Sequence, residues 1–446
     1  MEIGLIFLSL GISFLIGYLL IRPWLAGHSF EPLLLVFLAA GLGLGLSSQI
    51  IFYTLIIFGQ LNKFWVIAVH VLLLAFLIIQ NYQASKRNKI SLFFKGKMVP
   101  ADLLWMGLLG VVFVPIIIYV QLYPMGGWDA WSVWNLKAKF IFSGEERWKN
   151  MLDPIMWRSS PHYPLLLPLI NVWGWIFLSS PATAGPLIVS VLFTLLTVGA
   201  LIFGLKPRAG FAAATLGGLL LLTLPYFVQL ATSQYCDILF AFYLLAGIIS
   251  LWNTYQQKNT SMAFLAGIFL GFLSFTKNEG GLAMIIVAGL SIFYLRDKKL
   301  WGPLWAGCII TSIPTLLFDR FFSPGNQTFI NGLVSAAQPS DLYRLKMIFA
   351  FLWVDIKSHN WNGLWIVLAL GLILSRGRCF QREFAVIPLF LVVYLAMIFI
   401  YYYINTYFKI AWWLQVTLDR VFLGILPVIV FWVFASLRKK TAVRRS

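Results

Sequence analysis

The chain has 446 residues, of which 61% are hydrophobic and only 11% are charged, and its mean hydropathy is +0.87. Soluble domains are about one quarter charged, so this composition excludes a soluble globular protein and predicts an all-α polytopic membrane protein. The net charge of +18 does not indicate a nucleic-acid partner, because the basic residues cluster in short loops between apolar stretches and in the C-terminal tail. The cysteines Cys236, Cys308 and Cys379 are scattered and indicate neither a disulfide framework nor a zinc cluster.

Apolar stretches of about 20 residues, the length that crosses a bilayer as a helix, recur along the chain. The first stretch lacks a basic flank and a cleavage site, so we interpret it as a retained span rather than a signal peptide. About thirteen spans are expected, near residues 3–21, 33–59, 64–82, 103–122, 183–204, 211–229, 236–255, 262–276, 281–295, 302–318, 363–375, 384–404 and 421–437. We divide the chain into a three-helix N-terminal extension (1–82), a transmembrane module (83–437) with outer loops 123–182 and 319–362, and a basic cytoplasmic tail (438–446).

The distribution of basic residues predicts the orientation. Most of the 33 Lys and Arg residues fall in one alternating set of loops, which includes 83–102 and the tail 438–446. By the positive-inside rule these loops are cytoplasmic, so the N-terminus lies outside, the C-terminus inside and loop 123–182 outside. Most of the 15 acids then lie outside, where carboxylates can act as general bases or ligands of divalent metals. For any single acid, the alternative is that outer loops simply lack the basic bias.

The outer loops are expected to contain helices of their own. Segment 130–143 combines tryptophans with lysines and suits a helix in the membrane interface. Segment 164–179 is apolar but begins with a proline and contains a second one, and counting it as a span would reverse the charge pattern of every later loop. We interpret it as a second interfacial or re-entrant helix. A third helix is expected at 341–357.

Polar residues at the outer ends of the predicted spans are the candidates for a functional site. They are Asp129, His162, Asp237, Lys277 with Glu279, and Arg420. Each has a structural alternative: Asp237 could be only a helix N-cap, Lys277 and Glu279 could solvate a tight turn, and Arg420 could extend its side chain toward water. The repeat Gly41-x-Gly43-x-Gly45 lies within an apolar span and indicates close helix packing rather than a nucleotide loop.

In their order along the chain, these features resemble the GT-C superfamily of integral-membrane glycosyltransferases. The likeness is to the branch of the protein O-mannosyltransferases and the aminoarabinose transferase of lipid A, and it covers roughly residues 103–437. That branch has an acid in the first large outer loop, two interfacial helices, a Pro-rich aromatic phrase, a helix that opens with Asp, a Lys-x-Glu-Gly turn, and a late Arg followed by Pro. The matching residues are Asp129, Pro161-His162-Tyr163-Pro164, Asp237, Lys277-Asn278-Glu279-Gly280, and Arg420 with Pro427. The chain departs from the O-mannosyltransferases at Ala130, which follows Asp129 where they have Glu.

The resemblance implies a hexosyl- or pentosyltransferase of the bacterial cell membrane that acts in the synthesis of a cell-envelope glycan. The sugar would move from a polyprenyl-phosphate donor to a lipid, glycan or protein acceptor on the extracytoplasmic face, with inversion in a single displacement. Asp129 is expected to be the catalytic base. The cations expected to bind the donor phosphate are Arg420 first, because its guanidinium fork fits phosphate oxygens, then Lys277, with Lys137 and Lys139 in reserve.

Two questions stay open at this level. Asp237, Glu279 and His162 could orient the sugar or the acceptor, or they could bind Mg²⁺ or Mn²⁺ together with Asp129. The alternative function is a transporter or flippase of a lipid-linked saccharide, which predicts ionisable residues at mid-membrane depth and matching broken helices in two halves. The acids lie at helix ends instead, which favours an enzyme, although His70 within the third span keeps the alternative open.

Overall fold

The computed structural model of the chain describes residues 1–25, 30–87, 100–326, 329–330, 332 and 342–437. Over these residues the fold is helical and contains no strand, which confirms the predicted all-α class. Nine described helices are long and apolar enough to cross a membrane, or ten if one bent pair counts as a single span. Three more apolar helices have 10–17 residues, which is short for a bilayer, so the count of about thirteen spans stays a prediction.

The helices follow the predicted apolar stretches closely. The long ones are α1 (Glu2–Leu25), α2 (Pro32–Phe58), α3 (Lys63–Arg87), α4 (Pro100–Val112) with α5 (Val114–Leu122), α8 (Ala184–Ala209), α11 (Cys236–Gln257), α14 (Trp301–Phe321), α18 (Val386–Ile404) and α19 (Ile410–Leu437). The bent pair is α9 (Phe211–Leu222) with α10 (Pro225–Thr232), and the three shorter apolar helices are α12 (Thr260–Ser274), α13 (Asn278–Tyr294) and α17 (Leu364–Leu374). The two long loops 123–182 and 319–362 contain η1 (Ala130–Trp134), α6 (Asn135–Ser143), η2 (Glu145–Leu152), η3 (Pro154–Ser159), α7 (Leu166–Gly174), α16 (Leu342–Ile356) and η5 (His359–Trp361). The remaining short turns are η4 (Lys298–Leu300), η6 (Arg378–Phe380) and η7 (Arg382–Phe384).

The predicted span 211–229 is wrong as a single straight helix. α9 and α10 meet at an angle of 74°, and Leu224 between them has an extended backbone (φ −83°, ψ 122°). The cause is Pro225, which disfavours a helical conformation at the preceding residue and donates no backbone hydrogen bond. After the bend, α10 ends at Thr232, and residues 233–235 connect it to α11.

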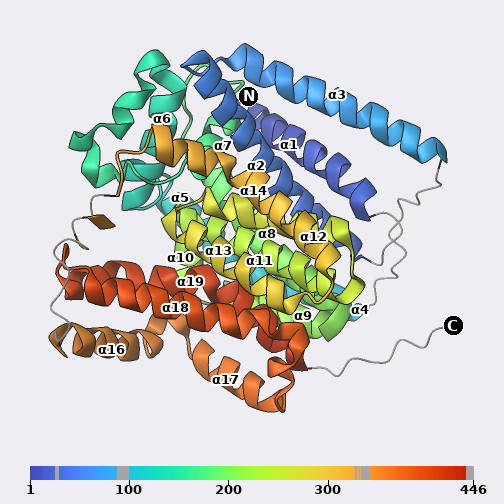
Figure 1. The fold of residues 1–446 in the computed structure, drawn as a ribbon, viewed down its shortest axis with the longest axis vertical. Coiled ribbons are helices and arrows are strands. Elements are labelled where there is room, and N and C mark those ends of the chain that lie inside the picture. The colour runs from blue at the N-terminus through green and yellow to red at the C-terminus, as the bar shows by residue number, and fades with distance from the viewer. Residues whose placement is uncertain (26–29, 88–99, 327–328, 331, 333–341, 438–446) are drawn as a thin grey trace.

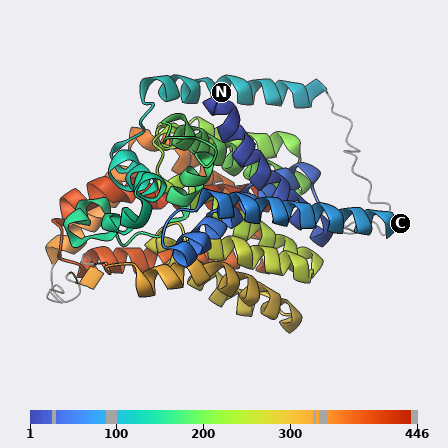
Figure 2. The ribbon, with the colours of Figure 1, turned by 90° about the horizontal axis from the view of Figure 1, so that it is seen from above.

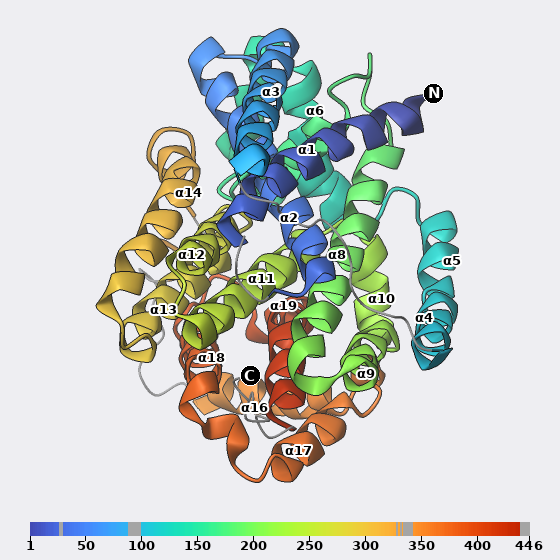
Figure 3. The same cartoon turned by 90° about the vertical axis from the view of Figure 1, so that its right-hand side faces the viewer.

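The core is built around α11, which is buried over almost its whole length. Figure 3 shows it surrounded by α2, α8, α12 and α19. α2 therefore belongs to the core, although the sequence assigns it to the N-terminal extension. A Cβ atom added at Gly43 would lie 1.7 Å from the carbonyl oxygen of Ser13 in α1, so the two backbones are in direct contact. This confirms close helix packing as the reason for the glycine repeat.

The loop helices gather at one end of the bundle. In Figure 1, α6 lies toward the left end of the long helices, whereas the last turn of α3, the start of α4 and α9 lie toward the right. Helix is confirmed over residues 130–143, as η1 and α6, and over most of 341–357, as α16. α7 is shorter than the predicted 164–179, and all nine of its residues are buried. By contrast, α4 and α5 lie along one edge of the bundle, at the top of Figure 2, with most of their surface exposed.

Candidate functional site

Arg420 in α19 joins two carboxylates that are far apart in the sequence. Its Nη1 donates to Oδ2 of Asp129 at 2.7 Å, and its Nε and Nη2 donate to Oδ2 of Asp237 at 3.0 and 2.8 Å. The guanidinium also lies over the ring of Tyr235, 4.9 Å from its centroid. The side chain of Arg420 is held within the protein and is only 18% exposed. Arg420 therefore does not simply extend toward water.

Lys277 completes the cluster from a fourth segment, immediately before α13. Its Nζ donates to Oδ1 of Asp237 at 2.8 Å, so each oxygen of this carboxylate has a cationic partner. Burial alone would lower the pKa of Lys277, but the carboxylates of Asp237 and Glu279 outweigh it and raise that pKa, so the ammonium stays charged. We call Asp129, Asp237, Lys277 and Arg420 the ionic cluster.

Asp237 owes its place to the start of α11 but is not an N-cap. The N-cap residue is Tyr235, whose side chain caps nothing, and Asp237 lies in the first turn with a side chain only 1% exposed. Negative charge in a first helical turn is favoured by the helix dipole. Because a buried carboxylate is costly unless it is paired, the two cations are what make this position tolerable.

Asp129 is positioned by a tight turn between α5 and η1. Gly126 has φ +70°, and the N–H of Gly127 donates to the carbonyl of Ser233 at 3.0 Å. A Cβ atom at Gly127 would lie 2.4 Å from Oη of Tyr235, so only glycine fits there without a shift. The same Oη accepts the N–H of Asp129 at 3.3 Å. The turn thus brings the Asp129 backbone against the segment that precedes Asp237.

A chain of buried amides holds the segments of the site together. Asn171 in α7 donates to Asn135, Asn135 donates to Gln234 at 2.7 Å, and Gln234 donates to the carbonyl of Pro124 at 2.9 Å. These bonds connect α7 and α6 to the turns before Asp129 and Asp237. Sequence reasoning missed this chain, although an asparagine inside the apolar run 164–179 is a signal that could have found it.

Glu279 lies close enough to Lys277 to affect its pKa, and one of its oxygens has no hydrogen-bond partner among the described residues. It lies in the first turn of α13, and its Oε2 is buried without a hydrogen-bond partner among the described residues. Burial, and next the negative charge of Glu279, raise the pKa of Tyr163 well above its usual value, so this tyrosine stays protonated beside the site. An unpartnered buried carboxylate oxygen calls for a donor hydrogen, such as that of a hydroxyl group.

The remaining predicted residues take different positions. Lys137 is fully buried and its Nζ donates to the backbone carbonyls of Ser160 and Tyr163, at 2.7 and 3.1 Å, whereas Lys139 is exposed. Burial lowers the pKa of Lys137 to about 7. His162 packs against the ring of Tyr163, and burial, then the charge of Lys137, lowers its pKa to about 4. Lys137 thus holds the loop that carries His162, and neither lysine has a bond to the ionic cluster.

A metal site is one of the two roles left open for Asp237, Glu279 and His162. The described residues contain no group of three or more His, Cys, Asp or Glu side chains arranged to hold an ion. Both oxygens of Asp237 are already bound to cations, and the ring of His162 packs against Tyr163. We therefore derive no step through Mg²⁺ or Mn²⁺.

A second pair of carboxyl groups adjoins the cluster and was missed from the sequence. Asp355 in α16 accepts from Nε1 of Trp361 at 3.1 Å, and Asp419, the residue before Arg420, accepts from Asn360 at 2.9 Å. Burial, then the neighbouring carboxyl of Asp419, raises the pKa of Asp355 to about 8. A raised pKa favours the protonated form of Asp355, and a proton on this carboxyl could be shared with Asp419. Asp355 falls in the predicted helix 341–357, but its partner could not be read from that pattern.

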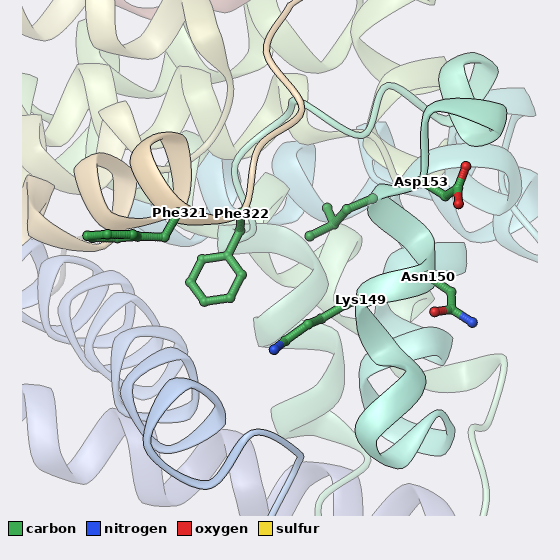
Figure 4. A pocket seen from close by; sticks show the side chains of 6 residues that line it. Lys149, Asn150, Asp153, Phe321 and Phe322 are labelled. Atoms are coloured by element: carbon green, nitrogen blue, oxygen red, sulfur yellow. The ribbon is translucent and has the colours of Figure 1, made fainter.

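A hollow on the surface of the same loop region is separate from the ionic cluster. It has a volume of about 290 Å³ and is lined by Lys149, Asn150, Leu152, Asp153, Phe321 and Phe322. In Figure 4 the side chain of Lys149 extends toward Phe322, and its Nζ lies 5.9 Å from the centre of that ring. No residue of the ionic cluster lines it.

Comparisons with known proteins return no relative. No protein-family model matches the chain, and no curated protein or solved structure matches it either.

Proposed function

We propose that the chain is a membrane glycosyltransferase that moves a sugar from a polyprenyl-phosphate donor to an acceptor at the extracytoplasmic face. The observation that carries the proposal is the ionic cluster, in which two carboxylates and two cations from four separate segments lie within ion-pair distance. The order of motifs that resembles the GT-C superfamily supports the same class. The positive-inside distribution of basic residues supports an outward-facing site in a bacterial cell membrane.

The proposed reaction is a single displacement at the anomeric carbon. The acceptor oxygen attacks that carbon while its bond to the phosphate oxygen breaks, and the phosphate leaves with the bonding electron pair. The leaving group is a stable anion and needs no general acid, but the acceptor hydroxyl is a weak nucleophile. Its proton passes to the carboxylate of Asp129, the more exposed of the two acids in the cluster. Attack from the face opposite the phosphate inverts the anomeric centre.

The two cations of the cluster are proposed to bind the donor phosphate. A guanidinium has five N–H donors, and three of those of Arg420 bond to carboxylates, which leaves one on each terminal nitrogen. Lys277 uses one of its three donors for Asp237. The free donors can bind phosphate oxygens through charge-assisted hydrogen bonds. Glu279, with its unpartnered oxygen, is proposed to accept a hydroxyl group of the sugar or of the acceptor.

The test measures a product that every such donor releases. The full-length protein in detergent is incubated with polyprenyl-phosphate-linked mannose, glucose, galactose or arabinose and with membrane extract as acceptor, and free polyprenyl phosphate is quantified by mass spectrometry. Asp129→Asn should reduce release by about 10²–10⁴-fold, the usual contribution of a general base. Asp153→Asn is the matched control, because this residue lies outside the cluster and its side chain only caps the N–H of Ile155.

Two outcomes count against the proposal. Release by Asp129→Asn at the parental rate would remove this residue as the base and leave Asp237 as the next carboxylate to test. No release from any donor, combined with movement of a fluorescent lipid-linked sugar across vesicles containing the protein, would favour the alternative of a transporter or flippase.

A further inference from the structure

The two carboxylates of the ionic cluster are held very unequally by Arg420. Asp237 is 1% exposed and accepts three charge-assisted hydrogen bonds, two from Arg420 and one from Lys277. Asp129 is 25% exposed and accepts a single bond, from Nη1 of Arg420 to its Oδ2. Asp237 is therefore a permanent anchor of the guanidinium, whereas Asp129 is the partner that an incoming anion can displace most easily.

The guanidinium has contacts that do not involve Asp129 and that can hold it in place when this carboxylate moves away. Its Nε and Nη2 stay bound to Asp237, and its plane rests on the ring of Tyr235. Only Nη1 changes partner, because it is the atom that Asp129 uses. Displacement would leave both hydrogens of Nη1 and one of Nη2 available to an anion. One hydrogen from each of these nitrogens forms the two-nitrogen edge that binds phosphate in a bidentate manner.

The charges of the site favour such an exchange over simple addition. Lys277 and Arg420 are already matched by Asp129 and Asp237, and Glu279 adds an unpaired carboxylate. A phosphate that entered beside Asp129 would meet a site without spare positive charge. If Asp129 moves away from Nη1, the phosphate takes its place and the cation is matched again.

We infer that the carboxylate of Asp129 occupies the phosphate position of Arg420 in the ligand-free protein, and that a phosphate anion displaces it. This inference rests on the proposed function and describes how donor binding would control the catalytic base. Without the donor, the base is bound to Arg420 and is a poor proton acceptor. When the donor phosphate binds, the same event frees Asp129 to take a proton from the acceptor. The base thus becomes active only when a phosphate, such as that of the donor, is bound to Arg420.

The experiment measures the affinity of the full-length protein in detergent for farnesyl phosphate, by titration calorimetry. Uncharged farnesol is the control for the lipid tail, and inorganic phosphate distinguishes a free anion from a lipid headgroup. Asp129→Asn removes the competing carboxylate and should tighten binding of farnesyl phosphate by about three- to fivefold, since a partly exposed ion pair is weak. Asp129→Ala, which also removes the hydrogen-bond acceptor, should tighten it at least as much.

Glu279→Gln is the matched control for charge alone. It removes one negative charge from the same site but frees no N–H of Arg420, so it should tighten binding less than Asp129→Asn does. Equal tightening by the two variants, or no tightening by Asp129→Asn while the parent protein binds, overturns the exchange and leaves the proposed function standing. If neither the parent nor Asp129→Asn binds farnesyl phosphate or inorganic phosphate, the inference and the proposed function both fail.

Discussion

Asp129 and Asp237 share one arginine, yet their loss should have very different effects on stability. Asp237→Asn removes the common counterion of Arg420 and Lys277, whose side chains are only 18% and 12% exposed. Breaking a buried ion pair on one side typically costs about 3–5 kcal/mol, because the remaining charges are left without compensation. Asp129→Asn removes one bond from a side chain that is 25% exposed, and such a pair is worth about 0.2–1 kcal/mol.

A double-mutant cycle measures the interaction between Arg420 and Asp237 separately from any other destabilising effect of each substitution. Arg420→Met should be strongly destabilising on its own, because Asp237 is 1% exposed and would keep only Lys277. In the background of Asp237→Asn the same substitution should cost less, with an interaction energy of about 1–3 kcal/mol. Pairing Arg420→Met with Asp153→Asn should be additive, since Asp153 lies outside the cluster and caps the N–H of Ile155.

The assay is unfolding of the purified full-length protein in detergent micelles, by denaturant titration, with tryptophan fluorescence as the signal. Size-exclusion chromatography before each titration confirms that the variant is folded and monodisperse. The reasoning would be refuted if Asp129→Asn were as destabilising as Asp237→Asn, or if Arg420→Met and Asp237→Asn were additive. Either result would mean that the buried carboxylate is not the anchor of the guanidinium.

Three further predictions concern the buried His162, the close packing at Gly127 and the orientation of the chain in the membrane. Burial lowers the pKa of His162 from 6.5 to about 4, so between these pH values the unfolded chain binds a proton that the folded protein does not. The free energy of unfolding should therefore fall by up to about 3 kcal/mol as the pH drops from 6.5 to about 4. His162→Gln should flatten that part of a plot of unfolding free energy against pH, and an unchanged slope would contradict the buried neutral ring. Gly127→Ala should destabilise by about 1–3 kcal/mol through contact with Oη of Tyr235, and Tyr235→Phe should partly relieve the loss; a neutral Gly127→Ala would contradict the close packing. In a cysteine-free background, an impermeant maleimide should label Asn150→Cys from outside and Lys258→Cys only from inside, and the reverse pattern would overturn the orientation and the outward-facing site.

The sequence by itself determined which parts of the chain are helical and where polar side chains interrupt them. Stretches such as Pro32–Phe58 and Cys236–Gln257 bury backbone polar groups in their own hydrogen bonds, so long apolar composition is enough to predict a helix. The prolines and glycines at helix ends likewise indicate, from the local sequence alone, where a helix begins or ends. For the same reason, Asp129, Asp237, Lys277 and Arg420 could be selected as candidates, because each is an ionisable residue in or beside a long apolar stretch.

Only the tertiary structure decided which of these residues meet. Arg420 bonds to Asp129 across 291 positions of sequence and to Asp237 across 183, and no spacing rule reaches that far. The tertiary structure also gives two lysines of one helix different environments. Lys137 is buried and donates to backbone carbonyls, whereas Lys139 is exposed. A helix is stabilised by bonds within a few residues, but the burial and pairing of a charge depend on how distant helices pack. The ionic cluster is therefore a property of the fold, although each of its members is visible in the sequence.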